Sequence, residues 1–393
     1  MVYQRQIYPR LEAELKTREI LVLTGMRRVG KTTAINYLYD LVETDNKAIF
    51  DLENPLHRKI FEEEDYDAVW SNLRQSGISN TSKAYIFIDE VQNLPDISRV
   101  VKYLYDHWDV KFVLTGSSSY YLRNLFPESL AGRKVVFELF PLNFAEFLVF
   151  KGLRREGDVT FEAKAKNKNR IVHEKLVPSY DEFMEFGGFP SVVLEENHER
   201  KRVLLSEIFT SYFEKDAKNL ADFEDMAKLR DLILLLIPRV GCRVEIAKLA
   251  ATLDTTRQTV YGYLAFLEGT YFISLLPKYS GSVDIQAAGK KKLFLCDSGV
   301  ANVLGKFSEG QLFEQSVFQN LKADHALTYY NKEGSGEIDF VVDSTTGLEV
   351  KVSASRWDVS QLQRRSRVLK LKESYLVSHD YSEYPETVLA TSL

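Results

Sequence analysis

Short apolar runs alternate with stretches of helical periodicity over the first part of this 393-residue chain. The runs cover residues 19–24, 48–52, 85–88 and 111–114. Buried strands of this length that alternate with amphipathic helices are typical of βαβ units, whose strands run parallel. The pattern therefore predicts an α/β core with a mainly parallel sheet over residues 1–150.

The pattern changes three times beyond this core. Residues 151–225 begin with a charged stretch and continue as helix, which favours a helical lid or linker. Residues 226–281 contain two helical stretches, a short turn and an apolar strand, as in a winged helix-turn-helix. Residues 282–393 return to strands and short helices, which indicates a second α/β domain.

Composition narrows the class of protein further. A hydrophobic fraction of 45% excludes a disordered chain, and 51 basic against 56 acidic residues give a net charge of −5, so any contact with nucleic acid must be local. The two cysteines are too few for a disulfide framework. The longest apolar run, residues 232–237, is too short to span a membrane, and the N-terminus lacks the apolar core of a signal peptide. We therefore expect a cytoplasmic protein without a membrane segment.

A phosphate-binding loop follows the first apolar run. Residues 25–32 fit G-x-x-x-x-G-K-[ST], placed between a strand and a helix as the chemistry requires. Gly25 and Gly30 allow the backbone to wrap the phosphates, Lys31 reaches the β- and γ-phosphates, and the Thr32 hydroxyl binds Mg²⁺. The residues expected to contact ATP here are Gly25, Arg28, Val29, Gly30, Lys31, Thr32 and Thr33.

Two acids follow the third apolar run. Asp89 at the end of a buried strand is expected to hold Mg²⁺, and Glu90 is expected to act as the base that deprotonates the attacking water. Ser117, after the fourth run, is expected near the nucleotide, although an ordinary serine-rich turn explains it equally well. Arg133 is a candidate for a γ-phosphate contact in its own chain or a neighbour's, or is a surface arginine.

The two helical stretches between residues 244 and 264 raise the question of DNA binding. Thr255 or Thr256 is expected to cap the second helix, which leaves Arg257, Gln258 and Tyr261 near its exposed start. Acidic residues cancel the three basic ones in this region. A DNA reader and a module that contacts a protein partner both remain open.

The last domain carries a pattern of carboxylates and lysine. Glu349 and Lys351 are two apart on an expected strand, and a hairpin would bring Asp339 alongside Glu349. Glu314 on the preceding helix is a further candidate. Asp339 and Glu349 would hold Mg²⁺, with Lys351 polarising the phosphate or the water, for phosphodiester cleavage. An edge hairpin with Glu and Lys on its wet face would show the same pattern.

Several motifs together resemble a known family. They are TGMRRVGKTT, YIFIDEVQNL, LTGSSS, LAGRK, FPLNFAEFL, FGGFPSVV, YFEKD, FEQSVFQNL and EIDFVV with LEVK. In this order they resemble the bacterial and archaeal AAA+-type ATPases that carry a C-terminal domain of unknown function. The resemblance implies an AAA+-like P-loop core, a helical and winged-helix region, and a C-terminal restriction-endonuclease-like fold. The C-terminal pattern also resembles that of PD-(D/E)XK nucleases.

These observations predict an ATP-binding protein that hydrolyses ATP with Mg²⁺ and acts on DNA as an ATP-gated nuclease. The alternative is a nucleotide-switched regulatory protein that binds a protein partner and whose nuclease-like domain is silent. AAA+ relatives often form rings, so a homo-oligomer is compatible with the resemblance.

Overall fold

The computed structural model describes residues 2–117, 132–153, 160–217, 226–282, 286, 289–332 and 336–393. The chain divides into two units. The first consists of Met1–Phe140, Glu214–Ala221 and Gly269–Tyr271, and the second of Pro141–Phe213, Asp222–Glu268 and Phe272–Leu393. The division into four domains stays a prediction.

Five parallel strands form the sheet of the first unit. Four of them are the apolar runs that predicted a parallel sheet, and β5 is a further strand at its edge. The strand order is β2-β3-β4-β1-β5. Because the chain crosses between non-adjacent strands, the ends of β1 and β3 lie at the same edge with β4 between them. The bounds are β1 Ile20–Thr24, β2 Lys47–Asp51, β3 Ala84–Asp89, β4 Val110–Gly116 and β5 Lys134–Glu138.

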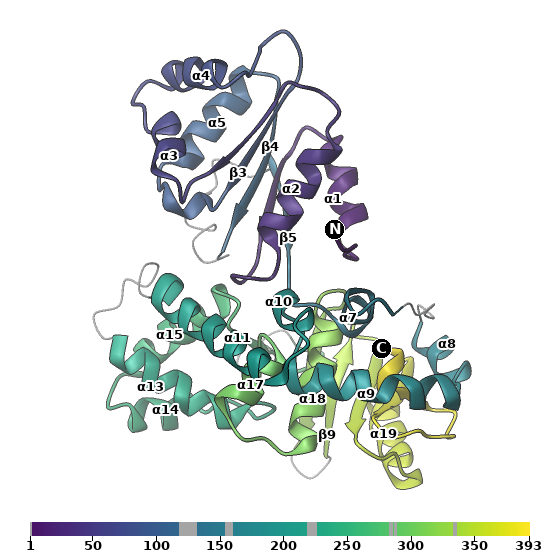
Figure 1. Ribbon diagram of the computed structural model, residues 1–393. Coiled ribbons are helices and arrows are strands. Elements are labelled where there is room, and N and C mark those ends of the chain that lie inside the picture. The colour runs from purple at the N-terminus through teal and green to yellow at the C-terminus, as the bar shows by residue number, and fades with distance from the viewer. Residues whose placement is uncertain are drawn as a thin grey trace. The chain divides into compact units, whose positions relative to one another are not determined.

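Helices cover both faces of this sheet (Figure 1): α1 and α2 lie on one side, and α3, α4 and α5 on the other. Side chains of Asn54 and Asp65 cap α3 and α4 by accepting from backbone N–H groups. The helices are α1 Tyr8–Leu15, α2 Lys31–Leu41, α3 Pro55–Phe61, α4 Tyr66–Gln75 and α5 Ile97–His107, with a short 3₁₀ turn η1 at Val91–Asn93.

The second unit begins with helices. They are α7 Phe144–Phe150, α8 Phe161–Lys166, α9 Arg170–Phe186, α10 Pro190–Val193, α11 His198–Ser211, α13 Met226–Leu236 and η4 Ile237–Arg239. The π-helical turn η3, Tyr212–Ala217, begins in this unit and ends in the segment Glu214–Ala221 of the first unit. Gly187 ends α9 with φ 74°, and a Cβ there would lie 2.0 Å from a carboxylate oxygen of Asp297. The glycine pair in the sequence therefore marks a helix end packed tightly against the buried Asp297.

Two helices and a hairpin follow where the sequence predicted helix, turn, helix and strand. Helices α14, Ile246–Thr252, and α15, Arg257–Gly269, are joined by a four-residue connection, and the antiparallel pair β6, Ile273–Leu276, and β7, Lys292–Leu295, follows. Thr256 accepts from the backbone N–H of Thr259 and so caps α15. The apolar side chains of the two helices are buried at Leu249, Ala250, Val260, Leu264 and Leu267.

A second sheet of five strands forms the C-terminal part, in the order β12-β11-β10-β9-β8. Strands β8, β9 and β10 are antiparallel, and β10, β11 and β12 are parallel. Helices α18 and α19 pack on opposite faces (Figure 1). The bounds are α17 Ser298–Leu304, α18 Glu309–Lys322, β8 Leu327–Lys332, β9 Gly336–Val342, β10 Thr346–Lys351, α19 Arg356–Leu369, β11 Glu373–Ser378, β12 Thr387–Leu389 and η5 Ala390–Ser392.

No helix in the described ranges is both long and apolar enough to cross a membrane.

Candidate functional site: a phosphate loop and a carboxylate cluster

The phosphate loop connects β1 to α2, as its sequence predicted. Gly25 has φ 152°, and a Cβ on it would lie 2.1 Å from the carbonyl oxygen of Leu139. Gly30 has φ 102° and immediately precedes α2. Both glycines are therefore needed, the first for close approach to a neighbouring strand end and the second for its left-handed backbone. Arg28, at φ 66°, and Thr33 are exposed beside the loop.

A buried arginine holds this loop from behind. Arg5 Nη1 donates to the carbonyl of Val29 at 3.1 Å, and Nη2 donates to that of Phe140 at 2.9 Å. The side chain of Val29 is fully buried and anchors the loop, and a contact of its backbone with ATP stays a prediction. Lys31 Nζ donates to the carbonyls of Gly25 and Met26 at 2.9 and 3.0 Å. Arg5 lies 20 residues before the first glycine of the motif, so the sequence pattern did not predict its contact with the loop.

Thr32 and Asp89 meet across the carboxyl edge of the sheet. The Thr32 hydroxyl donates to Asp89 Oδ2 at 2.8 Å, and the Thr115 hydroxyl donates to Oδ1 of the same carboxylate. A hydroxyl and a carboxylate oxygen beside a phosphate loop are the donor set that Mg²⁺ takes when nucleotide phosphates complete its shell. Thr32 and Asp89 therefore fit the predicted magnesium site.

Glu90 is held by a residue that the sequence analysis missed. Its backbone is left-handed, at φ 55°, and Gln92 Nε2 donates to Glu90 Oε2 and also, at 3.0 Å, to Ser117 Oγ. The backbone N–H of Ser117 donates to Gln92 Oε1 at 3.3 Å. Ser117 therefore reaches Glu90 through Gln92. The signal was an amide side chain two positions after the acid. Ser118 and Ser119 lie outside the described residues.

Arg133 lies at the other end of the sheet. Its carbonyl accepts from the N–H of Ile20, the first residue of β1, and its Nε lies 3.2 Å from Asp106 Oδ1. The phosphate loop begins after the last residue of β1, so the length of that strand separates the two. The expected contact with a γ-phosphate of its own chain is therefore wrong. A contact in a neighbouring chain stays a prediction.

The C-terminal carboxylates converge as the hairpin predicted. The pairing of β9 with β10 ends with Phe340 opposite Leu348, and Asp339 and Glu349 are the next residues along the two strands. Asp339 Oδ2 accepts from the N–H of Val350 at 2.8 Å. Lys351 Nζ lies 3.1 Å from Glu349 Oε1. Burial raises the pKa of Glu349 despite this lysine, whereas Glu349 and Asp339 raise the pKa of Lys351 against the effect of burial.

Three further residues that the sequence analysis did not place join this cluster. Lys292 Nζ lies 2.6 Å from Glu314 Oε1, 2.6 Å from Glu337 Oε1 and 3.4 Å from Asp339 Oδ1. Arg365 Nη1 donates to Glu349 Oε2 at 2.9 Å and to the carbonyl of Glu337 at 2.9 Å. Lys292 belongs to the lysine run at residues 290–292, and Arg365 to the basic part of α19, which were the available signals.

The cationic side chains of Lys292, Lys351 and Arg365 thus lie around these carboxylates, where a metal ion would bind. Burial and the neighbouring Asp339 raise the pKa of Glu314 to about 8, while the three carboxylates raise that of Lys292 although burial lowers it. In the part of the chain that the structure describes, no three His, Cys, Asp or Glu side chains are arranged to hold a metal ion. As arranged, Asp339 and Glu349 do not fit the predicted magnesium site, and Glu314, the further candidate for the catalytic site, pairs with Lys292.

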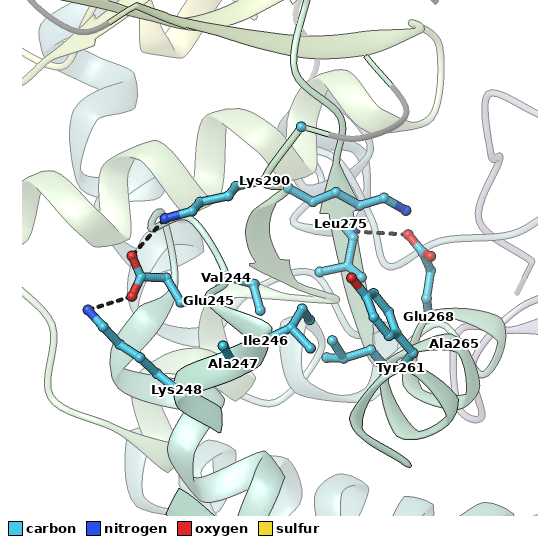
Figure 2. A pocket seen from close by; sticks show the side chains of 13 residues that line it. Val244, Glu245, Ile246, Ala247, Lys248, Tyr261, Ala265, Glu268, Leu275 and Lys290 are labelled. Carbon is cyan, nitrogen blue, oxygen red and sulfur yellow. Dashed lines mark hydrogen bonds and ion pairs between the residues drawn. The ribbon is translucent and has the colours of Figure 1, made fainter. Parts of the chain in front are cut away.

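A pocket of about 550 Å³ lies between α14, α15 and the segment that enters β7 (Figure 2). Its walls are apolar at Val244, Ile246 and Leu264, and Tyr261 stands at its edge, 58% exposed. Glu245 binds both Lys248 and Lys290, which lowers the pKa of this glutamate to about 2. The exposed start of α15, with Arg257 and Gln258, is separate from these walls.

Comparison with known proteins agrees with the first of these two sites. Residues 17–148 match the family described as AAA domain, and residues 177–311 match a domain of unknown function (DUF8612). An uncharacterized protein of Methanocaldococcus jannaschii is 28% identical over 84% of this chain and 74% of its own length, and one of Haemophilus influenzae is 26% identical over 93% and 90%. Both relatives thus extend across the two units.

Among solved structures, PCH-2 of C. elegans is similar over 53% of this chain and 69% of its own, with 12% identity and a TM-score of 0.34, which is too low to carry an argument about function. The AAA domain match includes the phosphate loop, Asp89 and Glu90. The match and the loop geometry support a P-loop ATPase in the first unit, with a nucleotide as its ligand.

Proposed function

We propose that the first unit hydrolyses ATP with Mg²⁺. The observation that carries this proposal is the meeting of Thr32 and Asp89 at 2.8 Å, beside Glu90 and the phosphate loop. Lys31 and Thr32 come from one segment of the chain and Asp89 and Glu90 from another, and binding of nucleotide phosphates with Mg²⁺ accounts for a lysine, a hydroxyl and two carboxylates at one sheet edge.

Each residue has a defined task. The loop N–H groups and the start of α2 bind the phosphates, and Lys31 balances charge on the β- and γ-phosphates. Mg²⁺ supplies further charge neutralisation when bound by Thr32, Asp89 and the phosphates. Glu90 accepts a proton from water as the water oxygen bonds to the γ-phosphorus, and the bond to the β–γ bridging oxygen breaks, which releases ADP and phosphate.

Phosphate release from ATP tests this proposal. Glu90→Gln should lower turnover by roughly 10²- to 10⁴-fold while nucleotide binding persists. Lys31→Ala should abolish binding as well. Glu174→Gln, a matched change at an exposed glutamate of α9 that pairs with Arg170, should leave turnover unchanged. Turnover that survives in Glu90→Gln would refute the assigned base.

We propose DNA as the partner on which this ATPase acts. The support is the exposed start of α15, where Arg257 and Gln258 lie as a recognition helix would present them. Binding of a plasmid fragment should weaken with salt and with Arg257→Ala, and DNA should raise the rate of ATP turnover. If neither salt nor Arg257→Ala changes the affinity, the alternative holds, a nucleotide-switched protein that binds a protein partner.

A second candidate function is phosphodiester cleavage by the C-terminal domain. The observation in its favour is that Asp339 accepts from the N–H of Val350, the residue after Glu349, while Lys351 Nζ lies 3.1 Å from Glu349, so that the three residues of the nuclease resemblance gather at one place. Plasmid nicking that disappears in Asp339→Ala and Lys351→Ala would support it. Intact plasmid with every divalent cation and with ATP would favour a silent domain.

A further inference from the structure

We infer that Lys292 occupies the position of a divalent cation in the C-terminal cluster and closes this cluster to metal. The occupancy of the cluster by Lys292 is independent of any activity. That Lys292 keeps the domain from cleaving DNA rests on the proposed nuclease function.

The contacts of Lys292 are those of a bound cation. Its side chain is 2% exposed, and its ammonium lies within 3.4 Å of carboxylate oxygens from three residues, Glu314, Glu337 and Asp339. These residues come from α18 and β9, so the ammonium joins a helix to the sheet. A divalent cation would need the same oxygens, because carboxylates that gather around one point form its shell.

Cationic side chains and a backbone N–H also neutralise the remaining carboxylates of the cluster. Glu349 is paired with Lys351 and with Arg365, and Asp339 Oδ2 accepts from the backbone N–H of Val350. Four carboxylates therefore face three cationic side chains and a backbone donor. An entering cation would meet an ammonium already in contact with its ligands, and the two like charges exclude each other.

The main chain of Lys292 is fixed, so the ammonium can leave only if its side chain moves. Lys292 pairs with Leu276 in the hairpin of β6 and β7 and forms a bridge with Arg243. The preceding Lys290 and Lys291 instead line the pocket of Figure 2. Two of the three consecutive lysines thus line the pocket, and only the last, Lys292, lies in the carboxylate cluster.

The test is to titrate the full chain with Mn²⁺ in the absence of nucleotide. The electron paramagnetic resonance signal of free Mn²⁺ measures how much of the ion is bound. Lys292→Met should create a site that binds Mn²⁺ roughly tenfold or more tightly than the wild type. Adding Asp339→Asn to Lys292→Met should remove it. Lys291→Met is the matched control, with the same change one residue away, and should bind Mn²⁺ as the wild type does.

Two outcomes would overturn the inference. One is a folded Lys292→Met protein that gains no Mn²⁺ site. The other is a wild-type site of equal affinity that Asp339→Asn removes, because Lys292 would then not exclude the cation. If Lys292→Met fails to fold, Lys292→Met combined with Glu337→Gln restores the charge balance and is subject to the same two criteria.

Plasmid nicking separates this inference from the proposed nuclease. Nicking that appears with Mn²⁺ only in Lys292→Met would support the closed cluster and would show that the wild-type domain is silent because Lys292 is present. Mn²⁺ bound by Lys292→Met without nicking would support the occupancy of the cluster by Lys292 and refute cleavage by this domain.

Discussion

The hydroxyl of Thr32 donates a hydrogen bond to Asp89 Oδ2 at 2.8 Å, although 57 positions separate the two residues in the chain. Thr32 lies at the start of α2, and Asp89 is the last residue of β3. Strand β4 lies between β1 and β3 in the sheet, so this hydrogen bond spans the middle of the carboxyl edge. It brings together the two side chains to which we assign Mg²⁺.

Thr32→Ala should therefore lower the apparent affinity for Mg²⁺ in ATP turnover by roughly 10- to 100-fold, because one oxygen ligand is lost. Thr32→Ser keeps the hydroxyl and should retain most of the activity. A magnesium titration of phosphate release compares the two. Equal curves for Thr32→Ala and the wild type would exclude Thr32 as a ligand.

Gln92→Leu should lower the rate of hydrolysis roughly 10- to 100-fold without weakening ATP binding, since Gln92 positions Glu90 and touches no phosphate in our assignment. The measurement is kcat beside the Kd of a fluorescent ATP analogue. Gln92→Glu, which replaces the donor by a second carboxylate near Glu90, should be at least as damaging. A loss of binding together with turnover would instead mean that Gln92 maintains the shape of the loop.

Gly25→Ala should destabilise the first unit by several kcal/mol and abolish ATP binding, because its Cβ would lie 2.1 Å from the carbonyl oxygen of Leu139. Gly77→Ala is a matched control in the same unit. Its φ is +95° and no atom lies within 4 Å of the added Cβ, so strain of about 1 kcal/mol is expected. The free energy of unfolding of both variants is measured with urea. The fluorescence of Trp70 and Trp108, which stack in this unit, reports the unfolding. Similar losses would show that φ, and not the close approach to Leu139, constrains Gly25.

Asp297 should make the second unit less stable as the pH rises. Burial raises the pKa of this carboxyl to about 6, although Gly188, Val300 and Gln319 donate hydrogen bonds to it. The folded state therefore holds the proton more tightly than the unfolded state, and stability is lost as the pH rises from about 4 through 6. Relative to Asp297→Asn, the wild type should lose about 2 kcal/mol between pH 4 and pH 7.

Urea midpoints of the wild type and Asp297→Asn at several pH values measure this difference. Asn cannot ionise, so its own curve reports all other titrating groups. A difference between the two proteins that stays constant from pH 4 to 7 would show that the pKa of Asp297 is not raised.

Arg133→Ala should leave basal ATP turnover by dilute protein within about twofold, since Arg133 is remote from the loop of its own chain and pairs with Asp106. If the protein forms a homo-oligomer in which Arg133 reaches a neighbour's γ-phosphate, turnover should rise with protein concentration in the wild type and not in Arg133→Ala. Turnover independent of concentration in both would remove this role.

Local pattern was sufficient for much of this protein. Short apolar runs that alternate with helical stretches indicate buried central strands, and a phosphate loop requires fixed residue types at a fixed spacing, so the parallel sheet, Lys31, Thr32, Asp89 and Glu90 were predictable. The hairpin that brings Asp339 close to Glu349 also followed, because strand period and turn length set its register.

Tertiary structure decided which side chains hold these residues. Arg5 behind the loop, Gln92 between Glu90 and Ser117, and Lys292 among the carboxylates act through contacts between elements, and no periodicity records such contacts. Arg133 was misplaced in its own chain for the same reason, since the sequence does not show which end of the sheet a residue reaches. The sequence by itself determined the strands and the phosphate chemistry, because both depend on local spacing. Only packing placed Lys292 beside Asp339, one of the two expected metal ligands, because that position depends on charges from three separate elements.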